Sequence, residues 1–170
     1  MSNEQQIEIE RLRTDLHEAH RARARQTYYF LVELRKEMEE SRVVEILRRA
    51  TARVGAEAAT KMAKAPGADK MGPSQLAQLY SQTSPDQGRI YPIRWQDRED
   101  GSCQVEVLAC PIKTEMESMG ISQHEFEQLV AILDGGTAAL IEGLGLSVRT
   151  CLPRLGGSVC CVLDIRRREQ

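Results

Sequence analysis

The sequence has no long apolar run, no excess of basic residues and few aromatic side chains. No stretch approaches the ~18 consecutive apolar residues of a membrane-spanning helix, so we expect no membrane segment. The net charge of −2 argues against a general nucleic-acid surface. The basic run "RARAR" (Arg21 to Arg25) has no interleaved aromatic groups, which favours a solvated helix face. We expect neither nucleic acid nor membrane among the partners.

The sequence also lacks the paired spacings of a metal site. It contains no C-x-x-C and no H-x-x-x-H, so we expect neither a metal nor another cofactor. Its five cysteines are an odd number and suggest no disulfide framework. The first residues, "MSNEQQIEIERLR", are polar and acidic, unlike a secretory signal. These features predict free thiols in a reducing, cytoplasmic compartment.

What is present indicates one globular chain with an unusual first helix. Charged residues make up 28% and hydrophobic residues 41% of 170 positions, which suits a folded domain rather than a disordered chain. Residues 3–26 show only a thin apolar stripe at helical spacing, formed by Ile9, Leu12, Leu16 and Ala19. We therefore divide the chain into a surface or interface helix, 1–26, and a single domain, 27–170. Such a thin stripe predicts a homo-oligomer, with a dimer favoured and this helix at the interface.

Two helical patterns follow the first. Residues 27–39 predict a second helix, and Ser41 suits the N-cap of a third. The third helix carries the clearest apolar face, which we expect to pack on a sheet; its residues are Val43, Ile46, Leu47, Ala50, Val54 and Ala58.

The pattern then changes to alternation typical of strands. Residues 89–95 and 103–110 predict one antiparallel hairpin, and residues 146–155 and 158–166 predict a second. Between them, Ser122 and Glu125 form the capping box of a helix. We expect Asp134-Gly135-Gly136 to interrupt that helix. The predicted fold is α+β, with N-terminal helices packed on a small antiparallel sheet built from two hairpins with helices between them.

Cys110 is the most distinctive candidate for chemistry. It ends a predicted strand, and Pro111 suits the first position of a following helix. Free backbone N–H groups at a helix start stabilise a thiolate, which predicts that Cys110 is the most reactive of the thiols. The alternative is a small buried side chain at a strand end.

Cys160, Cys161 and Asp134 have competing interpretations. Neighbours on a strand face opposite sides, so one of Cys160 and Cys161 is expected to be core packing. Cys110 and Cys160 are expected to share a pocket with Asp134. Asp134 could be a general base, or it could form a turn before the two glycines.

Together these positions resemble the L-2-amino-thiazoline-4-carboxylic acid hydrolase family. The similarity runs from about Val105 to Ile165 and rests on a set of spaced residues: Cys110, Met119-Gly120, Asp134, Glu142-Gly143, Arg149-Thr150, Gly156 and Cys160. The resemblance implies hydrolytic opening of a ring at a C=N carbon. It implies catalytic roles for Cys110, Asp134 and Cys160, and substrate binding by Arg149 and Thr150, with Arg149 holding a carboxylate.

The leading prediction is therefore a small-molecule hydrolase acting on a C–N or C=N bond of a cyclic or amidine-like substrate. Two alternatives remain open. The chain could be a non-catalytic module that binds or senses a small ligand, because such a module needs an apolar pocket but no reactive cluster. It could also be an accessory subunit whose first helix docks onto an enzyme partner.

Overall fold

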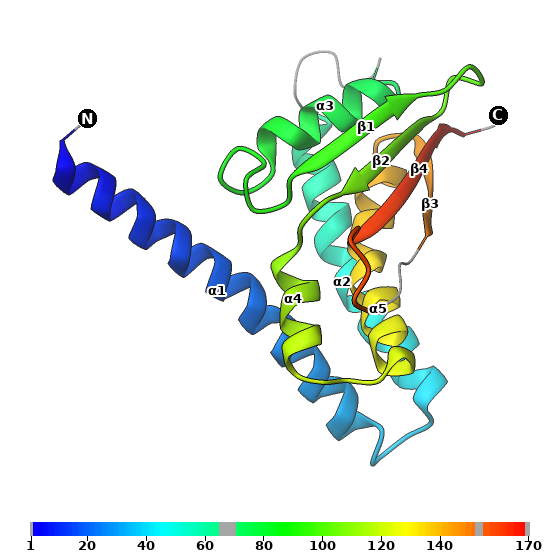
Figure 1. The fold of residues 1–170 in the computed structure, drawn as a ribbon. Coiled ribbons are helices and arrows are strands. Elements are labelled where there is room, and N and C mark those ends of the chain that lie inside the picture. The colour runs from blue at the N-terminus through cyan, green and yellow to red at the C-terminus, as the bar shows by residue number, and fades with distance from the viewer. Residues whose placement is uncertain (1, 65–70, 152–154, 169–170) are drawn as a thin grey trace.

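A computed structural model describes residues 2–64, 71–151 and 155–168 and shows an α+β fold. The predicted fold class is confirmed: two antiparallel hairpins form one sheet, with helices between them (Figure 1). In chain order the elements are α1 Asn3–Leu34, α2 Glu40–Met62, α3 Pro73–Thr83, β1 Ile93–Asp97, β2 Cys103–Val107, α4 Pro111–Ser118, α5 Gln123–Gly143, β3 Leu146–Cys151 and β4 Cys161–Arg167.

The four strands form an antiparallel sheet in the order β1-β2-β4-β3. Alternation along β2 buries Cys103, Val105 and Val107 and turns the intervening polar residues outward. We call the buried side the inner face. It packs against α3 and the end of α5 in a core formed by Leu76, Ala77, Cys103, Val105, Ile141, Leu146, Leu163 and Ile165. Of the strand predicted over 146–155, residues 152–154 lie outside the described ranges.

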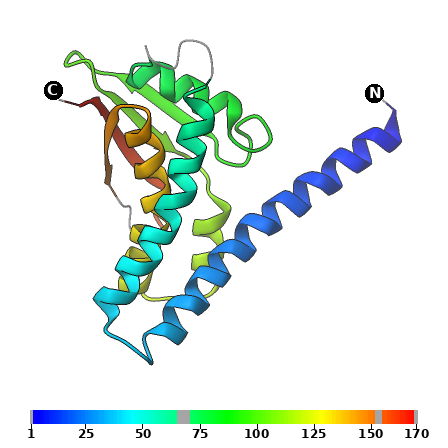
Figure 2. The ribbon, with the colours of Figure 1, turned by 180° about the vertical axis from the view of Figure 1, so that it is seen from behind.

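Helix α2 does not pack on the sheet as predicted. It lies along α5, which separates it from the strands (Figures 1 and 2). Val43 is fully buried, but Ala50 is exposed and Val54 is 59% exposed. The buried residues of α2 are Val43, Gly55 and Ala59, so small residues form the packed face of its second half. Such a face of small residues carries none of the large apolar groups at helical spacing that indicate a buried side.

The predicted break at Gly135-Gly136 is also wrong, because α5 continues through it to Gly143. The glycines allow α2 and α5 to approach closely. A Cβ added at Gly55 would lie 2.0 Å from the carbonyl oxygen of Gly136. The hydroxyl of Thr51 in α2 also donates to the carbonyl of Ile132 in α5. These residues serve the contact between helices rather than a turn.

Helix α1 is one continuous helix rather than the two predicted, and it crosses position 26 without a break. Its second half buries Ala24 and Leu31 in a second core with Val43, Met116, Ile121, Phe126, Leu129 and Ile132. Its first half extends away from the rest of the molecule and ends at the N-terminus (Figures 1 and 2).

Candidate functional site

Cys110 occupies the predicted position at the start of α4. It is the N-cap, with extended backbone, and Pro111 is the first helical residue. The backbone N–H groups of Ile112 and Lys113 at the helix start favour the thiolate and act to lower the pKa of Cys110. Burial of the half-exposed side chain has the larger effect, however, and raises the pKa of Cys110 above its usual value. The N–H groups at the helix start therefore oppose only part of the rise in the pKa of Cys110 that burial causes.

Cys160 and Cys161 lie at the beginning of β4, next to the end of β2. Cys161 is opposite Val107 in the sheet, on the inner face. Burial and the nearby Cys110 raise the pKa of Cys160 to about 11 and that of Cys161 to about 12. The three thiols therefore form one cluster between the end of β2, the start of α4 and the start of β4. Cys161 is the member packed against the inner core.

Asp134 reaches this region from α5. The hydroxyl of Thr150 in β3 donates to Asp134 Oδ1 at 2.7 Å. Burial raises the pKa of Asp134, and the hydrogen bond from Thr150 opposes that rise. The charge of Asp134 in turn raises the pKa of Cys161. The predicted residues Asp134 and Thr150 are therefore in direct contact.

Arg149 is separated from them. It precedes Thr150 on β3, so its side chain points to the outer face, where it is exposed opposite Asp164. The structure does not place it with Asp134 and Thr150. Across residues 2–64, 71–151 and 155–168, no group of three His, Cys, Asp or Glu side chains could hold a metal ion.

An apolar crevice adjoins the thiol cluster. It lies between α3, α5 and the inner face, with a cavity volume of about 20 Å³, and its lining residues are Leu76, Ala77, Tyr80, Val105, Thr137, Leu140, Ile141, Leu163 and Ile165. A space of this size holds about one water molecule. Tyr80 lines the crevice and also lies near the thiols. Burial, together with the nearby Cys161 and Cys110, raises the pKa of Tyr80 to about 12.

The sequence analysis did not predict this crevice. Its only local signal is the spacing of Leu76, Ala77 and Tyr80, which places them on one face of the short helix α3. The opposite wall comes from α5 and two strands far away in the sequence.

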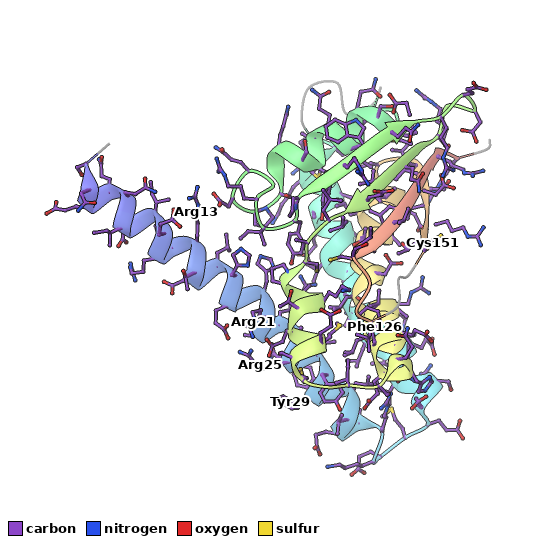
Figure 3. All side chains as sticks on the ribbon, viewed as in Figure 1. Arg13, Arg21, Arg25, Tyr29, Phe126 and Cys151 are labelled. Carbon is purple, nitrogen blue, oxygen red and sulfur yellow. The ribbon has the colours of Figure 1, made fainter. Side chains whose placement is uncertain are left out.

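The predicted solvated basic face holds for Arg23, which is exposed, but not for Arg21 and Arg25, which bind α4. Arg21 Nε and Arg25 Nη1 donate to Glu115 of α4 at 2.6 and 2.7 Å (Figure 3). Glu115 is only 5% exposed. Closer to the N-terminus of α1, Arg13 Nε donates to Asp86 Oδ2 at 2.9 Å. These ion pairs fix α1 against α4 and the loop before β1.

The apolar stripe of α1, formed by Ile9, Leu12, Leu16 and Ala19, lies on the part of the helix that projects from the body. Leu12 is 54% exposed, and Ala19 is exposed as well. Ile7, near the stripe, is 62% exposed. Ile9 and Leu16 are half-buried, so the stripe is an apolar surface that is only partly exposed.

Comparisons with known proteins show a shared fold. No protein-family model matches the chain, and no curated protein matches its sequence. A solved structure does match: a trafficking protein particle complex subunit 3 from Naegleria fowleri, covalently bound to palmitic acid. The TM-score is 0.62 at 11% identity, over 89% of this chain and 96% of that one. At this identity the likeness shows the fold and nothing further.

The comparison overturns the leading functional prediction. The matching fold belongs to a subunit of a trafficking complex, not to a hydrolase, so the prediction of a ring-opening C–N hydrolase is wrong. The binding-module and accessory-subunit alternatives agree better with this neighbour. The resemblance to the thiazoline-carboxylate hydrolase family stays a prediction, as do the roles assigned to individual site residues. In the described part of the chain, the helices are too short or too polar to cross a membrane.

Proposed function

We propose that this protein is a non-catalytic module that holds an apolar chain in the crevice between α3, α5 and the sheet. The observation that carries the proposal is the lining of the crevice, where apolar side chains from a helix on each side meet buried residues of β2 and β4. A protein of the same fold holds palmitic acid. We therefore take a long-chain fatty acid as the ligand class.

Binding requires the crevice to open. Its present volume of about 20 Å³ is far below the roughly 300–1,000 Å³ of ordinary ligand pockets. We take α3 as the element that moves aside, because its residues Leu76, Ala77 and Tyr80 form one wall of the crevice. An acyl chain would replace the apolar contacts that these residues lose, so opening exposes little apolar surface to water.

Non-covalent binding is the form that the thiols support. Formation of a thioester requires a thiolate, and burial raises the pKa of Cys110, Cys160 and Cys161. At neutral pH these groups are protonated and react slowly. We expect the chain to hold a free fatty acid without a covalent bond.

The test is fluorescence titration with hexadecanoic acid that carries a fluorescent BODIPY group. We expect saturable binding that unlabelled palmitic acid displaces. Leu76→Trp fills the crevice and is expected to weaken binding at least tenfold, and Thr137→Leu narrows it from α5 with a smaller effect. Gln78→Trp, on the exposed side of α3, is the matched control and should bind like the wild type.

Two results would contradict the proposal. One is the absence of saturable binding by the wild-type chain. The other is undiminished affinity in a folded Leu76→Trp variant, with its helical circular dichroism preserved.

A second candidate function, assembly through α1, is favoured by the apolar stripe, of which Leu12 and Ala19 are exposed. We infer that the partner is a second copy of this chain. Ile9, Leu12, Leu16 and Ala19 follow the alternating three- and four-residue spacing of a two-helix seam. Glu4 is exposed near the start of α1 and Arg23 is exposed beyond the other end of the stripe, so two antiparallel copies would bring unlike charges together.

A further inference from the structure

The outer face of the sheet is polar, and no helix covers it in the described part of the chain. In Figure 1 the strands lie in front of α2 and α5, and Figure 2 shows these helices from behind. Alternation along β2 turns Gln104 and Glu106 to the outer face. Asp164 of β4 is opposite Gln104 in the strand register and shares this face. The outer face is therefore a surface of charged and amide side chains.

Three arginines gather around one carboxylate on this face, and we call them the arginine cluster. Arg166 Nη2 donates to Asp164 Oδ2 at 2.8 Å, and Arg98 Nη1 donates to the same oxygen at 3.4 Å. Arg98 Nη2 also donates to Gln104 at 3.0 Å. The third member, Arg149 of β3, is opposite Asp164 in the register. Three guanidinium groups thus lie around a single carboxylate.

A second carboxylate nearby leaves the balance positive. Asp100, in the turn between β1 and β2, acts electrostatically on Arg98 and Arg166. Its Oδ1 accepts hydrogen bonds from the backbone N–H and the hydroxyl of Ser102. The arginines still outnumber the carboxylates, so this face attracts anions although the whole chain has a net charge of −2.

Arg149 is the member of the cluster with donors to spare. Its side chain is exposed, and it has no ion pair or hydrogen bond with another side chain among the described residues. A guanidinium group presents five N–H donors and binds a carboxylate through two of them at once. The donors of Arg149 are therefore open to an incoming carboxylate.

The relief of the face favours side chains over a flat surface. Asp164 is only 15% exposed, whereas Arg98 and Arg166 are 39% and 55% exposed. The cluster thus has a recessed centre and a projecting rim. Beside it, and sharing Gln104, is a hollow of about 250 Å³ lined by Arg94, Trp95, Gln96, Gln104 and Glu106. Side chains of a peptide can enter such recesses, while a planar membrane meets only the rim.

We propose that the outer face of the sheet binds an acidic, extended segment of a partner protein, with Asp or Glu side chains of that segment held by the arginine cluster. A short segment suits the site better than a long polyanion such as a nucleic acid, because the excess of positive charge is confined to this face. The inference does not depend on fatty-acid binding, since the crevice lies on the inner face.

The test is fluorescence anisotropy of the full chain with a fluorescein-labelled peptide of alternating Glu and Ser residues. Alternate side chains of an extended peptide point the same way, so all of its Glu side chains can face the sheet. We expect saturable binding that weakens as salt is added, because salt screens exposed charges. The same peptide with Gln in place of Glu should not bind.

Matched variants locate the binding surface. Arg149→Gln is expected to weaken binding about tenfold, through loss of one charge-assisted contact. Because Arg149 is exposed, the variant should keep the circular dichroism of the wild type. Arg53→Gln removes the same charge from the exposed side of α2 and should bind the peptide like the wild type.

Three results would overturn the proposal. The first is the absence of saturable binding of the Glu peptide by the wild-type chain. The second is an equal affinity of Arg149→Gln and the wild type, and the third is an equal loss in Arg149→Gln and Arg53→Gln, which would show an effect of net charge alone. Sedimentation with vesicles of phosphatidylcholine and phosphatidylserine tests the other source of negative charge. We expect the chain to stay in solution, and tighter binding to these vesicles than to the peptide would assign the face to a membrane instead.

Discussion

Gly55 shows how single residues set the distance between α2 and α5. A side chain there would collide with a backbone atom, the carbonyl oxygen of Gly136, which cannot rotate away. The contact between the helices therefore depends on the absence of a Cβ at Gly55. The same two helices also contribute to the second core, α2 through Val43 and α5 through Leu129 and Ile132. The close packing of α2 on α5 is stable here because Gly55 has no side chain.

We predict that Gly55→Ala destabilises the protein. Overpacking costs about 1–3 kcal/mol, and the upper end applies because the obstructing atom is in the backbone. The gain of about 1 kcal/mol from helix propensity does not offset it. Urea denaturation is the measurement. In Gly136→Ala the added Cβ would lie 3.2 Å from the carbonyl oxygen of Thr51, so we expect a much smaller change. A stabilised Gly55→Ala would show that the helices are farther apart.

At the residue scale, the sequence predicts local features well and contacts between helices poorly. The capping box of Ser122 and Glu125 and the helix start at Pro111 are both confirmed, because each depends on neighbours a few positions away. Gly135 and Gly136 were misinterpreted because glycine signals a break when no partner helix is known. The structure supplies that partner.

At the scale of elements, Glu115 of α4 holds α1 through ion pairs with Arg21 and Arg25. The carboxylate is buried between two guanidinium groups, Arg25 and Arg21, which lower its pKa below the usual range. A lowered pKa in the folded state adds stability above the pKa of the unfolded chain, about 4.3. That stability is lost as pH falls through the folded pKa.

We predict that Glu115→Gln destabilises the protein at pH 7 by about 1–3 kcal/mol, the usual loss for a charged hydrogen-bonding group. The difference from the wild type should shrink as pH falls below about 4.3, where the wild-type carboxyl also becomes neutral. Urea denaturation between pH 3 and pH 7 measures it. Glu8→Gln removes an exposed pair with Arg11 on the same helix and should have no measurable effect. An undiminished difference at pH 3 would rule out this account.

The role of these arginines could not be predicted from their own segment. "RARAR" is locally a basic helix face, and a partner 90 or more positions away decides that it is a binding surface for Glu115. The same limit applies to the crevice, whose walls combine α3, α5 and two strands. The alternation of strands and the helix periodicities predict the fold class, but they do not specify which helix covers which face.

At the scale of the whole molecule, the projecting half of α1 predicts a dimer. We expect light scattering at micromolar concentration to give twice the chain mass for the wild type. Leu12→Asp places a charge within the apolar stripe and should give the monomer mass. Because Leu12 is 54% exposed, the substitution should leave the fold intact. Thr14→Asp, exposed on the same helix, is the control. A wild-type monomer would reject the proposed assembly, and a dimeric Leu12→Asp would place the interface elsewhere.

The length of α1 has a mechanical consequence. The ten residues of α1 before Arg13, positions 3–12, form a rod of roughly 15 Å, at 1.5 Å per residue. The ion pair of Arg13 with Asp86 holds this rod at its base, so tilting it by about 10° moves its tip by roughly 2.5 Å, at the same rise per residue. Small adjustments of Asp86 and the loop before β1 would thus produce larger displacements at the N-terminus. The N-terminal part of α1 therefore amplifies small movements of the body into larger movements of its tip, where a binding partner would detect them.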